Sequence, residues 1–416
     1  MLYQWLLVLK KPSNKLWVSA ASWALLTVIF VLSLRLGART LEVASLPDIK
    51  QETLESLLNV IASSMLAVTT FSLSIMVAFA SASNGATPRA TDLVMGDSTT
   101  RTAITSFICA FIYAIIAKTA LGMAFYAQNG RFILFISTVA VLLYLIITLI
   151  RWVYTLSQLG RLGNTLEKIE QVTGNALQQY RHCPQMNAVS TRQLSSVAKK
   201  IEARKSGYLT HIDMQGLQKK AQALEGYIHI YVRPGELISP DTVICALETE
   251  QDVEEEILRQ YFVLAKGRTY EQDPNWGFIV LSEAAQRALS PAVNDPGTAI
   301  NIMAIMMNLF VQEPEPQSEA HMVEYDRLSI AQLDCAEWIR DAFAPISRDG
   351  AGILEVNLVM QKVLASIWRN VPEKAVSNAA LLMAEQALAR AEQALVLQAE
   401  REQLREKHNQ LFHSVR

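Results

Sequence analysis

A run of 33 residues, from Ser56 to Pro88, contains no Asp, Glu, Lys or Arg. A helix that crosses a bilayer needs about 20 mostly apolar residues, each rising about 1.5 Å along the axis. The run is therefore long enough to span a membrane with a turn to spare at each end. Because it is too long and too apolar for a helix of a soluble core, it predicts a transmembrane helix.

Several polar residues of this run share one helical face. At 100° per residue, five of them fall within about 60° of one another: Asn59, Ser63, Thr70, Ser74 and Ser81. We call this face the hydroxyl stripe. It is expected to face protein or water, since an unpartnered hydroxyl in hydrocarbon is costly.

Two interpretations of the stripe stay open. In the first, small Ser and Thr side chains let neighbouring helices approach closely. In the second, the stripe lines a water-filled path in an oligomer. Hydroxyls that lie off the stripe weaken the second interpretation: Ser64, Thr69, Ser72 and Ser83. The apolar residues of the opposite face are Ile61, Met65, Val68, Ile75 and Phe79.

The other apolar runs also lie before residue 151, in a chain that is 51% hydrophobic and 18% charged. They predict four transmembrane spans, at about 16–34, 58–83, 102–127 and 132–150. The fold class that we expect is an α-helical integral membrane domain over 1–157, followed by cytoplasmic parts. These are an α+β unit over 158–250, a helical domain over 251–370 and a long C-terminal helix over 371–416.

Charge around the spans predicts their orientation. With four spans, eight Lys and Arg residues lie near the spans on the side of the termini and four on the other side. The positive-inside rule therefore places both termini in the cytoplasm. Lys118 is the one Lys, Arg, Asp or Glu inside a predicted span. It is either a functional charge or a long side chain that reaches the membrane interface.

The period of the apolar pattern changes after residue 157. Three strands are expected at Gly207–Ile212, Gly226–Val232 and Thr242–Leu247, with a helix at Met214–Leu224. The remaining segments read as helices: Leu159–Tyr180, Ser195–Arg204, Val253–Leu264, Phe278–Leu289, Thr298–Val311, Leu328–Phe343 and Ile353–Trp368.

The last helix, from about Pro372, carries a short heptad pattern. Leu381, Leu388 and Leu395 recur every seven residues, with Ala384 and Ala391 three residues after the first two. Such a seam predicts a contact that holds an oligomer together, although a helix folded back on its own domain gives the same pattern.

Between Gly267 and Thr298, charged residues stand among prolines, glycines and a tryptophan. The candidates for a pocket or a subunit contact are Arg268, Asp273, Trp276, Arg287, Asn294 and Asp295. In the structural interpretation, Asp273 and Asp295 each cap a helix that starts with proline, and the arginines form ion pairs. In the functional interpretation, two arginines and two helix N-termini bind a small anion or a nucleotide.

Motifs of catalysis and cofactor binding are absent from the sequence. It contains no HExxH, GxSxG, GxxxxGK[ST] or GxGxxG, and its six histidines and four cysteines have no metal-binding spacing. We therefore expect no metal, no cofactor and no enzymatic activity. The net charge of −2 also argues against nucleic acid as a partner.

Several of these stretches resemble one bacterial family. They are Phe71-Ser72-Leu73 through Pro88-Arg89, Tyr113, Arg233-Pro234-Gly235, Gln272 to Gly277 and, most specifically, Arg287-Ala-Leu-Ser-Pro-Ala-Val-Asn-Asp-Pro296. Up to about Trp368, the chain resembles the predicted membrane proteins grouped as domain of unknown function 2254. The resemblance implies a bacterial inner-membrane protein with a four-helix N-terminal part and a cytoplasmic C-terminal part, but no substrate.

The function that we expect is an oligomeric channel- or transporter-like protein with a cytoplasmic regulatory domain. The stripe would line its path and Lys118 would bias its charge preference. The alternatives are a non-conducting interaction or scaffold protein of the envelope, and a membrane-bound enzyme that uses the Asp273 and Asp295 region.

Overall fold

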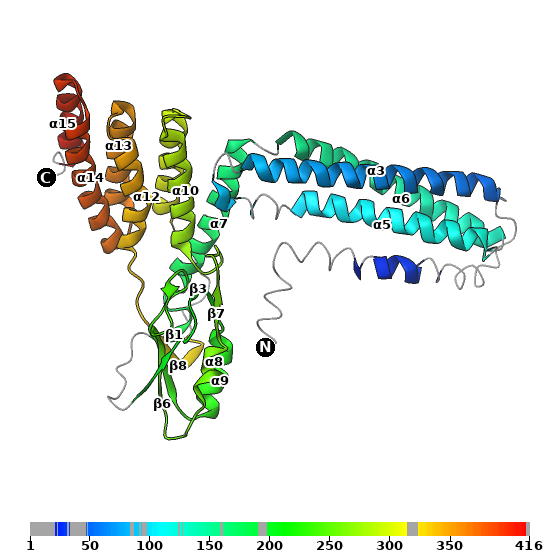
Figure 1. The fold of residues 1–416 in the computed structure, drawn as a ribbon, viewed down its shortest axis with the longest axis horizontal. Helices are drawn as coiled ribbons and strands as arrows, with labels where there is room; N and C mark the ends of the chain where they lie inside the picture. The colour runs from blue at the N-terminus through cyan, green and yellow to red at the C-terminus, as the bar shows by residue number, and fades with distance from the viewer. Residues whose placement is uncertain are drawn as a thin grey trace. The chain divides into compact units, whose positions relative to one another are not determined.

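The computed structural model divides the chain into two compact units, residues 2–165 and residues 166–416 (Figure 1). It describes residues 21–22, 24–30, 33, 47, 49–83, 87–90, 93, 98–123, 125–126, 128–158, 161–189, 198–313 and 323–412.

The described residues of the first unit contain three helices that are long and apolar enough to cross a membrane. They are α3 (Gln51–Ser83), α5 (Ser98–Gly122) and α6 (Gln128–Gln158), and the short 3₁₀ helix η1 (Pro88–Ala90) lies between the first two. These helices correspond to the second, third and fourth expected spans. Of the first expected span, 16–34, the structure describes residues 21–22, 24–30 and 33, and all of these are helical.

The core of this unit contains the apolar face of α3. Ile61 and Met65 are buried, and Val68 and Ile75 pack partly buried against the same core, as the pattern opposite the stripe predicts. Helices α5 and α6 are also joined by hydrogen bonds. The Tyr113 hydroxyl lies 2.9 Å from Ser137 Oγ and 3.0 Å from Thr138 Oγ1. Such bonds are a common way for membrane helices to satisfy polar groups.

The second unit begins with α7 (Leu162–His182) and continues into two sheets. Sheet A has the order β1 (Ala188–Val189), β8 (Tyr325–Ile330), β4 (Tyr227–Ile230), β6 (Val243–Glu248) and β2 (Lys199–Glu202). Its β1–β8 and β8–β4 pairs are parallel and the others antiparallel. Sheet B is antiparallel, with β5 (Leu237–Ile238), β3 (Gly207–Ile212) and β7 (Phe262–Ala265) in that order. Helices α8 (Met214–Ala223) and α9 (Glu255–Arg259) accompany the sheets.

The three expected strands and the helix between them are confirmed, but three expected helices are wrong in part. Residues 199–202 form strand β2 instead of part of a helix over Ser195–Arg204. Val253–Leu264 contains the short α9 and the start of β7, and Leu328–Phe343 contains the end of β8 before a helix. Each misread segment pairs with a strand far away in the sequence. Because β8 lies in sheet A beside β4, the sheet crosses the boundary that we expected at residue 250.

Six helices form two packed rows, and strand β8 lies between the second and third of them in the chain. They are α10 (Pro274–Leu289), α11 (Pro296–Val311), α12 (Ala336–Asp349), α13 (Leu354–Asn370), α14 (Lys374–Ala394) and α15 (Gln398–Phe412). One row is α10, α12 and α14, and the other is α11, α13 and α15. We call these six helices the helical stack. Helix α7 packs closely on α10, because a Cβ atom added at Gly277 would lie 1.9 Å from Thr173 Oγ1.

The expected long C-terminal helix is broken after Ala394. Helix α15 turns back and lies against α13 and α14. Its His408 Nδ1 is 2.8 Å from Gln361 Oε1 of α13. The heptad residues Ala384, Ala391 and Leu395 are buried within the chain itself. In a single chain, therefore, the seam belongs to a helix folded back on its own domain.

Candidate functional site

The hydroxyl stripe lies on the side of α3 that faces away from the core. The residues Asn59, Ser63, Thr70 and Ser74 are exposed in the single chain, and the side chain of Ser81 lies outside the described ones. Each of the three hydroxyls donates to a carbonyl one turn earlier. The distances are 2.8 Å from Ser63 to Asn59 O, 3.1 Å from Thr70 to Leu66 O and 3.0 Å from Ser74 to Thr70 O. Since the hydrogen is used inside the helix, each oxygen presents its lone pairs outward as acceptors.

Lys118 joins the stripe at its N-terminal end. Its Nζ donates to Asn59 Oδ1 at 2.9 Å and connects α5 to α3. The structure therefore brings together two residues that the sequence singled out separately. The amide oxygen of Asn59 is neutral, so it satisfies one donor of the ammonium group without cancelling its charge.

Arg268, Asp273 and Trp276 gather at the start of α10. Arg268 Nε and Nη2 donate to the two carboxylate oxygens of Asp273 at 2.7 and 2.8 Å, and the guanidinium lies 5.1 Å from the centre of the Trp276 ring. Asp273 also accepts from Trp276 N at 3.2 Å and so caps the helix. Burial raises the pKa of Asp273, whereas Arg268 and the backbone N–H groups oppose the rise. The backbone of Gly235, at φ +100°, packs directly on this carboxylate.

Arg287, Asn294 and Asp295 lie at the other end of α10, whose 16 residues correspond to a length of about 24 Å. Asp295 caps α11 by accepting from Thr298 N at 3.0 Å and from Thr298 Oγ1 at 2.6 Å, and these bonds hold its pKa below the usual range. Asn294 has a φ of +50°, and Arg287 is exposed. The capping roles of both aspartates are thus confirmed. The six candidates do not form one pocket in a single chain, and a contact between subunits stays a prediction.

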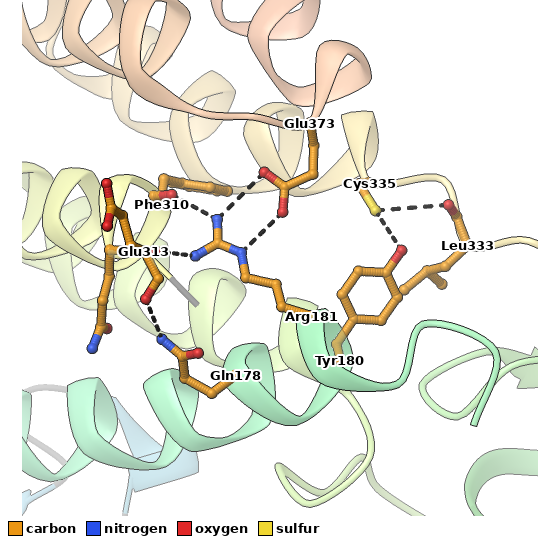
Figure 2. Close-up of polar contacts among 9 residues, drawn as sticks. Gln178, Tyr180, Arg181, Phe310, Glu313, Leu333, Cys335 and Glu373 are labelled. Atoms are coloured by element: carbon orange, nitrogen blue, oxygen red, sulfur yellow. Dashed lines mark hydrogen bonds and ion pairs between the residues drawn. The ribbon is translucent and has the colours of Figure 1, made fainter. Parts of the chain in front are cut away.

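A buried ion pair that sequence reasoning missed lies at the end of α7 (Figure 2). Arg181 Nε donates to Glu373 Oε1 at 2.9 Å, and the Arg181 side chain is only 3% exposed. Its Nη2 donates to Phe310 O at 2.7 Å and its Nη1 to Gln312 O. One guanidinium therefore binds the C-terminal carbonyls of α11 and the residue that precedes α14. We call Arg181 and Glu373 the α7 ion pair.

Residues next to the α7 ion pair extend these contacts to α11 and α12. The Tyr180 hydroxyl lies 3.0 Å from Cys335 Sγ at the start of α12, and Gln178 Nε2 donates to Glu313 O at 3.2 Å (Figure 2). Burial raises the pKa values of both Tyr180 and Cys335. The phenol and the thiol are therefore neutral near pH 7.

Arg233 connects this region to sheet A. The residue is 5% exposed, and its Nε donates to Ala331 O at 2.7 Å, just after β8. Its Nη2 donates to Pro184 O at 2.8 Å, just after α7. Two buried arginines thus fix the end of α7, one toward the helical stack and one toward the sheet.

The residues that the structure describes contain no group of three His, Cys, Asp or Glu side chains that could hold a metal ion. A family model described as "Predicted membrane protein (DUF2254)" matches residues 13–366. No curated protein and no solved structure matches the chain.

Proposed function

Because the chain belongs to the DUF2254 family of predicted membrane proteins, we propose that it is an oligomeric, channel- or transporter-like protein of the bacterial inner membrane. Both termini and the second unit lie in the cytoplasm, and the protein is not an enzyme. The hydroxyl stripe lines the path, and the second unit regulates it.

The observation that carries this proposal is the position of the stripe. Asn59, Ser63, Thr70 and Ser74 lie on an exposed face of a helix that is apolar enough to cross a membrane. A row of oxygen lone pairs along a helix that crosses the membrane can interact favourably with a small hydrated cation. The Lys118 ammonium beside Asn59 adds a positive charge at one end of the row and so sets how strongly cations are admitted.

The competing function is a non-conducting scaffold of the envelope. It is favoured by the internal bonds of the stripe, since a hydroxyl that already donates to its own helix needs no water. In this case the small side chains serve to pack α3 against a helix of another chain.

Flux through proteoliposomes separates the two functions. Ser74→Leu places an apolar side chain on the stripe and abolishes cation flux if the stripe lines the path. Ser64→Leu is the matched control, because Ser64 is also exposed and also donates to a carbonyl one turn earlier, but lies off the stripe. Equal flux through both variants and the original protein would exclude the stripe from the path, and no flux through the original protein would favour the scaffold.

A further inference from the structure

We propose that the last turn of α7 couples the helical stack to the first unit, so that a change in the stack alters the conformation of the membrane helices. In this proposal, the α7 ion pair holds the turn in the arrangement described above. The proposal concerns regulation and stands whether or not the protein conducts ions.

The first support is the position of α7 in the chain. Helix α6 ends at Gln158 and α7 begins at Leu162, so three residues connect the last candidate membrane helix to α7. The division between the two compact units, at Thr165 and Leu166, falls inside α7 itself. The start of α7 therefore lies close along the chain to the last candidate membrane helix.

The second support is the number of elements that meet at one turn. Within residues 178–184, side chains bind the end of α11, the start of α12 and the residue before α14. The carbonyl of Pro184 accepts from Arg233, which also donates to Ala331 O just after β8. The turn can move only if several of these contacts break or move with it. Packed elements of this kind switch between discrete arrangements instead of deforming gradually.

The third support is the use made of Glu373. This residue occupies the N-cap position of α14, yet its side chain makes no capping hydrogen bond there. It binds Arg181 instead, at a sequence distance of 192 residues. The first turn of α14 is thus held by a residue of α7, so the α7 ion pair ties the C-terminal end of the stack to the helix that follows the membrane unit.

The test is amide hydrogen exchange on the full chain in lipid nanodiscs, with Glu373→Gln as the variant. We expect about tenfold faster exchange in α7, in the last two turns of α6 and in residues 98–105 at the start of α5. The α5 segment is informative because it is not adjacent to α7 in sequence, while Phe107 of α5 packs against Trp152 of α6 with ring centres 5.8 Å apart.

Glu392→Gln is the matched control. Glu392 lies on α14 and is 26% exposed, as is Glu373, but its partner Arg405 is 56% exposed and belongs to α15. This variant is expected to leave exchange in α5 and α6 unchanged. Faster exchange confined to residues 166–412 in Glu373→Gln would overturn the proposal. If Glu373→Gln does not fold, Arg181→Lys takes its place, because it keeps the charge but loses the guanidinium fork. The same faster exchange in α5 and α6 is expected for this variant.

Discussion

At the scale of single residues, two aspartate caps and one buried ion pair hold the ends of helices in the second unit. Asp273 and Asp295 cap their helices as predicted, because a cap depends on residues three positions away. The α7 ion pair joins residues 192 positions apart, and neither Arg181 nor Glu373 stands in a motif. Nothing in the sequence distinguishes these two side chains from charges on a solvated surface.

Lys118 provides the prediction on ion preference. Replacing it with Met removes the positive charge beside Asn59 while keeping an unbranched apolar stem. We expect the reversal potential of the reconstituted protein to shift toward stronger cation preference. Lys118→Arg retains the charge and is expected to stay close to the original value. An unchanged reversal potential in Lys118→Met would exclude Lys118 from the mechanism.

Gly277 provides a prediction on packing. A Cβ atom at this position would lie 1.9 Å from Thr173 Oγ1 and 2.6 Å from Thr173 Cβ, so α7 and α10 must separate to admit it. Gly277→Ala is expected to destabilise the second unit by about 1–3 kcal/mol. Gly163→Ala, where no atom lies within 4 Å, is the control and should not destabilise. Thermal unfolding of the full chain in detergent measures both, and equal melting temperatures would contradict the close contact.

At the scale of elements, the membrane helices and strands β3, β4 and β6 followed from local patterns. Strands β2, β7 and β8 did not, because each was read into a predicted helix and is fixed by a partner strand elsewhere in the chain. Tertiary pairing overrides weak local preference in such segments. The break in the C-terminal helix was missed for a related reason, since the heptad pattern continues through Leu395 and describes a seam without specifying its partner.

The cap of α11 provides a prediction on pH. The pKa of Asp295 is lowered in the folded chain, whereas an unfolded Asp has a pKa of about 3.9. Its stabilisation is therefore complete above the unfolded pKa and is lost as the pH falls through the folded pKa. We expect the original protein to melt above Asp295→Asn at about pH 6, and the gap to be smaller at about pH 3, which lies below the unfolded pKa. A gap that is the same at both pH values would contradict the linkage.

The heptad of α14 provides a prediction on oligomerisation. Ala391 is fully buried within the chain and Ala389 is exposed on the same helix. Ala391→Leu overpacks the contacts of α14 and should lower stability by about 1–3 kcal/mol, while Ala389→Leu should not. If the seam were instead an oligomer interface, Ala391→Leu would dissociate the oligomer without a change in stability. Chemical unfolding and light scattering on the same samples distinguish the two results.

At the scale of the whole molecule, the order of the parts followed from composition. Apolar runs at the N-terminus gave a membrane unit, and the change of period gave a mixed α/β region after it. The expected boundary at residue 250 did not match the fold, since β8 returns to sheet A after α10 and α11. Short-range patterns could not show this return, because it depends on where a distant strand finds an edge.

The central claim is that the hydroxyl stripe faces water in the assembled protein. The most direct measurement is the reactivity of cysteines placed on α3, in lipid vesicles, toward a charged thiol reagent that cannot cross the bilayer. The chain used carries Cys109→Ala, and mass spectrometry of the α3 peptide separates the signal from Cys183, Cys245 and Cys335. We predict rapid modification of Ser63→Cys, Thr70→Cys and Ser74→Cys, and protection of Ser64→Cys. Protection of the three stripe positions to the same degree as Ser64→Cys would contradict the account.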